Sequence, residues 1–96
     1  MEGKEIVLAT GSKPIELPNL PFDGKMIISS DQAIALDKVP KRLVVVGAGA
    51  IGLELGCVWS RLGSEVTILE FLPDICPQLD PEISNTTRKI FDKQGV

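Results

Sequence analysis

Four residues of this sequence have the types and the spacing of a nucleotide-binding site. Gly47, Gly49 and Gly52 follow an apolar, β-branched run at 43–46 with the spacing G-x-G-x-x-G. Glu70 ends the next apolar run and follows Gly52 by 18 residues. A strand, a glycine turn, a helix, a second strand and an acid about 20 residues past the turn form the first half of a dinucleotide-binding βαβ unit. The sequence therefore predicts a dinucleotide site, against the simpler interpretation of an ordinary glycine-rich turn.

Each glycine is expected to have its own role. Gly47 permits the sharp turn that leaves the strand, and Gly49, without a Cβ, lets the backbone approach a diphosphate closely. Gly52 lets the helix pack tightly against the strand. The free N–H groups of the first helical turn then point at the phosphates, and the helix dipole favours their negative charge.

Glu70 stands where an acid meets the adenosine ribose in such units. Its carboxylate could accept hydrogen bonds from both ribose hydroxyls and would repel a 2′-phosphate. No Lys or Arg occurs between Arg61 and Arg88 to bind such a phosphate. We therefore predict NAD rather than NADP as the cofactor. The alternative for Glu70 is a solvated residue at the end of a strand.

Composition excludes several other classes of function. The chain has 96 residues, a net charge of −3 and scattered basic residues, so we expect no nucleic acid or anionic membrane as partner. No apolar run approaches the ~20 residues of a membrane span, and the N-terminus does not resemble a signal peptide. Cys57 and Cys76 form neither a disulfide framework nor a metal-binding pair. The chain has no histidine, so it cannot itself supply an imidazole base.

The predicted fold class is α/β, a partial Rossmann-like, doubly wound parallel sheet in three layers. Apolar runs predict strands, and capping residues predict where helices begin. A proline-rich loop is expected between the first strand and Gly24. The expected elements are a strand at 6–9, a helix at about 30–37, a strand at 43–46, a helix from the glycine turn to Leu62, a strand at 66–69 and a helix from Asp80 to Gly95.

Helical spacing also predicts which side chains share a face. In the helix after the glycine turn, an apolar face is expected to pack on the sheet, and Trp59 is expected to be structural. Its members are Ile51, Leu55, Val58, Trp59 and Leu62. In the last helix the expected face holds Ile83, Thr87 and Ile90, with Phe91 beside it.

Nearly the whole chain resembles the dihydrolipoamide dehydrogenase branch of the flavoprotein pyridine nucleotide-disulfide oxidoreductases. Residues 6–12 (IVLATGS) resemble the end of the FAD-binding domain of that family. Residues 47–56 (GAGAIGLELG), 58–67 (VWSRLGSEVT) and 70–72 (EFL) resemble its NAD-binding segment. The run E-L-G-x-V-W-x-R-L-G is more specific to this branch than the glycine motif alone.

The resemblance implies site residues for two cofactors. Glu54 is similar to an acid near the nicotinamide carboxamide, although it could instead complement the helix N-terminus. The turn Thr10-Gly11-Ser12 resembles a backbone contact to FAD, and without the resemblance it would be only a polar turn. The NAD-binding role is carried by position to Gly47, Ala48, Gly49, Ala50, Ile51, Gly52, Leu53, Glu54 and Glu70.

The resemblance further implies that the chain is an internal piece of such an enzyme. Residues 1–12 would end the FAD-binding domain, 13–40 would cross over, and 41–96 would form the first half of the NAD-binding domain (βαβα). The family's redox pair of cysteines four residues apart, its catalytic histidine and its first FAD-binding glycine motif are absent from the sequence. We therefore expect no catalytic residue and no metal ligand here, and an isolated chain that is inactive.

The implied parent is a homodimer and a component of 2-oxoacid dehydrogenase complexes, in bacterial cytoplasm or in the mitochondrial matrix. Two alternatives remain open at this point. One is a related flavoprotein reductase, against which the lack of basic residues after Glu70 counts if it uses NADPH. The other is a stand-alone dinucleotide-binding or regulatory module.

Overall fold

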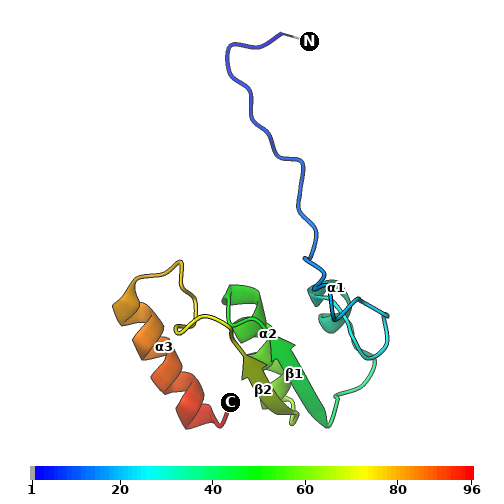
Figure 1. The fold of residues 1–96 in the computed structure, drawn as a ribbon, viewed down its shortest axis with the longest axis vertical. Coiled ribbons are helices and arrows are strands. Elements are labelled where there is room, and N and C mark those ends of the chain that lie inside the picture. Colours follow the sequence, from blue (N-terminus) through cyan, green and yellow to red (C-terminus); the bar gives the residue numbers. More distant parts are fainter. Residues whose placement is uncertain (1) are drawn as a thin grey trace.

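The computed structural model describes residues 2–96, so the first residue of the predicted segment 1–12 lies outside the described part. Two strands and three helices form the ordered body, and the N-terminal segment runs away from it as an extended chain (Figure 1). In chain order the elements are α1 (Ser30–Ala33), β1 (Arg42–Val46), α2 (Ala50–Arg61), β2 (Glu65–Leu69) and α3 (Pro81–Gln94).

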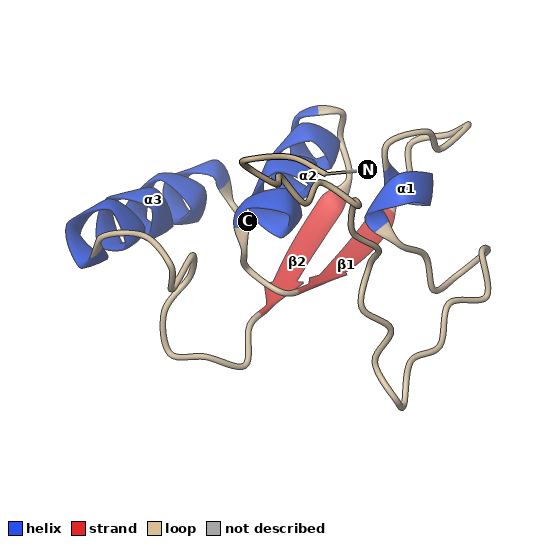
Figure 2. Cartoon of the chain, turned by 90° about the horizontal axis from the view of Figure 1, so that it is seen from above, coloured by secondary structure: helices blue, strands red, loops and turns tan. Residues whose placement is uncertain are grey.

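The βαβ unit predicted around the glycine motif is present. β1 and β2 pair in parallel with Val44 opposite Thr67, and α2 makes the crossover between them. The helices lie on one face of this sheet (Figure 2), while Val44 and Val46 of the other face stay exposed. The α/β, Rossmann-like class is confirmed. Of the three predicted layers, residues 2–96 supply the sheet and one helical layer.

Helix α2 packs on the sheet through a face different from the predicted one. Trp59 is buried as expected, but Ile51, Val58 and Leu62 are exposed, so that part of the prediction was wrong. The buried residues are Leu53, Gly56 and Trp59. The physical reason lies in the glycines, because only residues without a Cβ let the helix backbone come this close to a strand. Counting apolar side chains misses a packing face that is made partly of glycine.

The segment at 6–9 is extended but forms no strand, which corrects the prediction. Its side chains are exposed, and no segment of residues 2–96 pairs with it to form a ladder. An apolar β-branched run becomes a strand only where another strand supplies hydrogen-bond partners. The expected domain limits at residues 12 and 40 stay predictions.

Helix α1 is shorter than the expected 30–37, since it ends at Ala33. Its start is correctly predicted, because Ser29 and Gln32 form a reciprocal capping box. The helix buries no residue of its own, so packing does not favour another turn. In addition, the Ala33 carbonyl accepts a hydrogen bond from Trp59 Nε1 at 3.0 Å. This bond links α1, which lies in the segment 13–40, to α2.

Helix α3 begins and ends where predicted. Asp80 caps its N-terminus, and Gly95 ends it in the left-handed region with φ +80°. Ile83 and Ile90, which share the predicted face, are exposed, whereas Ser84 is buried. The Ser84 hydroxyl donates to the Cys76 carbonyl at 3.2 Å, and this bond turns the Ser84 side of the helix inward.

Candidate dinucleotide-binding site

The glycine turn lies at the carboxyl end of β1, where nucleotides bind in parallel α/β sheets. The Gly47 N–H donates to the Leu69 carbonyl at 2.8 Å, so the turn also touches the end of β2. Gly47 has φ +106°, a conformation that residues with a Cβ rarely adopt. Two residues later, Gly49 is the N-cap of α2.

Gly49 and Gly52 differ in what surrounds them. A Cβ on Gly52 would collide with the Gly47 carbonyl oxygen and press on Val45 Cγ1, so this glycine serves the contact between helix and strand. A Cβ on Gly49 would meet only Gln78 Nε2, at 4.0 Å, which is ordinary contact. The protein's own packing therefore leaves the Gly49 side open, as a site for close approach by a ligand requires.

The N-terminus of α2 has backbone N–H groups without a hydrogen-bond partner in the helix. Gly49 has no side chain to cap the helix, and the first turn carries no acid. The first N–H groups of a helix have no partner within the helix, and they favour an anion there. Glu54 lies beyond the first turn and is exposed, which counts against the interpretation that it complements the helix N-terminus.

The Glu70 carboxylate joins the end of β2 to the glycine turn. Its Oε2 accepts from the Ala48 N–H at 2.7 Å, and its Oε1 accepts from the Leu72 N–H at 2.8 Å. The bonds from Leu72 and Ala48 hold the pKa of the Glu70 carboxyl below its usual range, because they stabilise the ionised form. An ionised carboxylate therefore stands beside the turn at neutral pH, with further lone pairs on both oxygens.

The loop after Glu70 is fastened over the turn. The Cys76 N–H donates to the Ala48 carbonyl at 2.9 Å, and the Cys76 carbonyl accepts from the Leu79 N–H at 2.8 Å. Cys76 itself is buried with φ +45°. This loop brings Gln78 to the open side of Gly49, a neighbour that no local motif in the sequence indicated.

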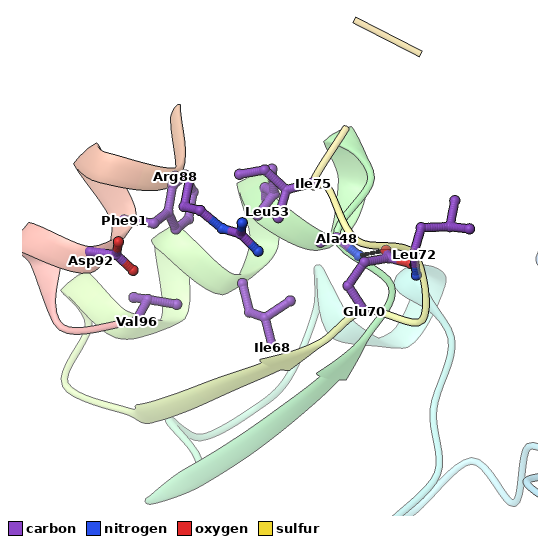
Figure 3. Close-up of a pocket in the computed structure, with 10 residues that line it drawn as sticks. All are labelled: Ala48, Leu53, Ile68, Glu70, Leu72, Ile75, Arg88, Phe91, Asp92 and Val96. Atoms are coloured by element: carbon purple, nitrogen blue, oxygen red, sulfur yellow. Dashed lines mark hydrogen bonds between the residues drawn. The ribbon is translucent and has the colours of Figure 1, made fainter. Parts of the chain in front are cut away.

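A cavity of about 280 Å³ lies beside this arrangement, between α2, β2 and α3 (Figure 3). Leu53 and Phe91 supply apolar wall, and Glu70 and Arg88 are among the charged residues of the lining. The Arg88 guanidinium donates to the Pro73 carbonyl at 3.4 Å. The rest of the lining is Ala48, Ile68, Leu72, Ile75, Asp92 and Val96.

The position of Arg88 corrects the expectation that no basic residue lies near Glu70 to bind a 2′-phosphate. No basic residue follows Glu70 closely in the chain, but α3 brings Arg88 to the cavity that Glu70 lines. The available signal was helical spacing, because Ser84, Arg88 and Phe91 recur at intervals of four and three residues. Distance along the chain was a poor measure of which charged residues share a cavity with Glu70.

The structure gathers most of the predicted NAD-binding residues but not all. Residues 47–53 and Glu70 lie together around the turn, with Leu53 forming cavity wall. The Ile51 side chain is exposed, so only its backbone belongs to the turn. Glu54 lines a second hollow between α2 and α3 and not the cavity beside Glu70.

The FAD contact predicted at residues 10–12 stays a prediction. Thr10, Gly11 and Ser12 are exposed in the extended N-terminal segment and line neither of the two hollows described above. Gly11 has φ +83°, which fits a turn but identifies no ligand.

Residues 2–96 form neither a disulfide nor a metal centre. Cys57, half-buried on α2, and Cys76 are both free. Within 2–96 no group of three or more His, Cys, Asp or Glu side chains is placed to hold a metal ion. None of the helices in this range has the length and apolarity needed to cross a membrane.

Comparison with known proteins gives consistent matches. The family model described as pyridine nucleotide-disulphide oxidoreductase matches residues 1–96. Dihydrolipoyl dehydrogenase 3 of Pseudomonas putida is 53% identical over 100% of this chain and 21% of its own length. The mitochondrial dihydrolipoyl dehydrogenase of Pisum sativum is 50% identical over 100% of this chain and 19% of its own length.

A solved structure shows the same fold. The crystal structure of LpdA from Mycobacterium tuberculosis matches with a TM-score of 0.79 and 32% identity, over 91% of this chain and 19% of that one. The chain thus spans about a fifth of the length of the relatives it matches.

Proposed function

Because the chain belongs to the pyridine nucleotide-disulphide oxidoreductase family, we propose that it is the NAD-binding segment of a dihydrolipoamide dehydrogenase. Relatives with that activity in their names are 50 and 53% identical over the whole chain. The observation that carries the proposal is the open side of Gly49 next to the Glu70 carboxylate.

The residues around the turn fit a dinucleotide diphosphate. The phosphates would lie against Gly49, with the first N–H groups of α2 as donors and the helix dipole opposing their charge. The hydrogen bond from Ala48 to Glu70 fixes the turn before any ligand arrives, which lowers the entropic cost of binding. When bound, NAD would supply the hydride acceptor.

Glu70 would hold the adenosine ribose. Each of its oxygens already accepts one backbone N–H and keeps lone-pair capacity for a ribose hydroxyl. Its ionised state would repel a 2′-phosphate, so NAD is preferred over NADP. Arg88 lines the same cavity and is the observation that favours the second candidate, a related flavoprotein reductase that uses NADPH.

The activity of the whole protein belongs to the same proposal. The parent would oxidise dihydrolipoamide, with electrons passing through a redox disulfide and FAD to NAD. Cys57 and Cys76 are free and separated in the chain, so they are not that disulfide. The catalytic groups, the homodimer and the place in 2-oxoacid dehydrogenase complexes would come from the remaining sequence. The matched relatives include bacterial and mitochondrial proteins, and we propose the cytoplasm or the mitochondrial matrix accordingly.

Titration of the protein with NADH and with NADPH tests this proposal. We expect tighter binding of NADH, and Glu70→Ala should weaken it about tenfold through loss of hydrogen bonds to a charged acceptor. Glu65→Ala, an exposed acid at the other end of β2, is the matched control and should leave NADH affinity unchanged. A preference of the wild type for NADPH, or full NADH affinity after Glu70→Ala, would overturn the proposal.

The two candidates can also be separated through Arg88. If the site is built for NAD, Arg88→Gln should leave NADH affinity unchanged. In the Glu70→Ala background, where the repulsion is gone, Arg88→Gln should lower NADPH affinity. A large NADPH loss from Arg88→Gln alone would favour the NADPH-dependent reductase.

A further inference from the structure

We propose that the side-chain amide of Gln78 is a further ligand of the dinucleotide diphosphate. The inference rests on the proposed dinucleotide function and deepens it, because it names a donor outside the glycine motif. Gln78 lies 29 residues after Gly49 in a loop without any glycine of its own, and its position became visible only in the fold.

The Gln78 amide borders the open side of Gly49, where a Cβ would point. Gln78 Nε2 lies 4.0 Å from the place of a Cβ on Gly49, and apart from Gly49 and the residues adjacent to it in the chain no other heavy atom lies within that distance. A phosphate oxygen that contacts the Gly49 backbone on this side therefore comes within reach of the amide. The Gln78 side chain is exposed, so its N–H donors are accessible to a ligand.

The loop around Gln78 is held at both sides. Cys76, two residues earlier, is tied to the Ala48 carbonyl, and its own carbonyl accepts from Leu79 and from Ser84. Two residues later, Asp80 caps α3 through the Glu82 N–H at 2.8 Å. The backbone of Gln78 is therefore positioned by the turn itself, and only the side chain has to adjust to a ligand.

The chemistry suits a neutral donor. An amide N–H donates to a phosphate oxygen without adding a charge that would also attract a 2′-phosphate. The α2 N-terminus and Gln78 would then approach the diphosphate from different elements, one from the helix and the other from the loop. In this arrangement Gln78 would contribute to the binding of the diphosphate and not to the binding of the adenosine.

Binding measurements on three ligands test the assignment. NADH is followed by its fluorescence, and ADP-ribose and adenosine are followed by competition. Gln78→Ala and Gln78→Met should each weaken NADH and ADP-ribose about tenfold, or ~1.4 kcal/mol, and leave adenosine unchanged. Gln78→Met keeps the length of the side chain but has no N–H, so it separates lost hydrogen bonding from lost bulk. Gln94→Ala, an exposed glutamine at the end of α3, is the matched control.

The outcomes are distinct for the two proposals. Wild-type NADH affinity in Gln78→Met would overturn the role of Gln78 and leave the dinucleotide site standing. An equal loss for adenosine would also overturn it, since the effect would then be on the shape of the site. Absence of NADH binding in the wild type would overturn the proposed function and this inference with it. Thermal unfolding of each variant should match the wild type, because Gln78 is exposed.

Discussion

Gly52 offers the sharpest test of how the fold holds the glycine turn. A Cβ at this position would approach the Gly47 carbonyl oxygen more closely than real Cβ atoms do, and it would lie 3.2 Å from Val45 Cγ1. The obstructing oxygen belongs to the backbone of the turn and cannot swing aside. Gly52→Ala must therefore push α2 away from β1 or distort the turn at Gly47.

The expected magnitude follows from two opposing terms. Alanine is favoured over glycine inside a helix by about 1 kcal/mol. Overpacking costs about 1–3 kcal/mol where side chains can shift, and the upper end applies here because backbone must move. We expect Gly52→Ala to lower the free energy of unfolding by about 2 kcal/mol. It should also abolish tight NADH binding, because the displaced turn is the one that receives the diphosphate.

Gly56→Ala is the matched control on the same helix. Its Cβ would lie 3.1 Å from Ile68 Cδ1, the flexible end of a side chain that can turn away. The helix-propensity gain then offsets the contact, so the free energy of unfolding should change by less than about 1 kcal/mol. Denaturant unfolding of both variants decides the matter. Equal effects at the two positions would refute the argument that Gly52 alone faces an immovable atom.

Further predictions concern other parts of the chain. The lowered pKa of Glu70 contributes stability that is present above the ordinary value of 4.5 and is lost as the pH falls through the folded-state pKa. The difference in unfolding free energy between wild type and Glu70→Gln should therefore shrink only at acidic pH, and a constant difference down to pH 2 would contradict this. Trp59→Phe leaves the Ala33 carbonyl without its donor and should lower the free energy of unfolding by about 1–3 kcal/mol, as denaturant unfolding would measure. An unchanged midpoint would be evidence that this bond does not hold α1 to α2. Asp80→Ala removes the cap on the Glu82 N–H and should cost about 0.5–2 kcal/mol, whereas Asp80→Asn should cost less, as thermal unfolding would measure.

Features that depend on neighbours in the chain could be predicted. The turn at Gly47, the capping box at Ser29, the start of α3 at Asp80 and its end at Gly95 all depend on a few adjacent residues. Their chemistry is local, so the residue types suffice. The family was evident for the same reason, since its motifs are contiguous.

Features that depend on distant partners could not be predicted in this way. The run at 6–9 has the composition of a strand, yet nothing in residues 2–96 pairs with it. The buried face of α2 includes Gly56, which a count of apolar side chains ignores. Helix α3 turns Ser84 inward because the Cys76 carbonyl is there to accept its hydroxyl.

The candidate site likewise has parts that follow from neighbours in the chain and parts that depend on distant partners. By itself the sequence determined the turn, the helix behind it and the acid at the end of the second strand, because each follows from spacing along one chain. Only the tertiary structure decided that Gln78 stands over Gly49 and that Arg88 shares a cavity with Glu70. Those positions depend on how the loop after β2 docks on the turn, and the backbone bond from the Cys76 N–H to the Ala48 carbonyl that holds it there leaves no mark in the residue types.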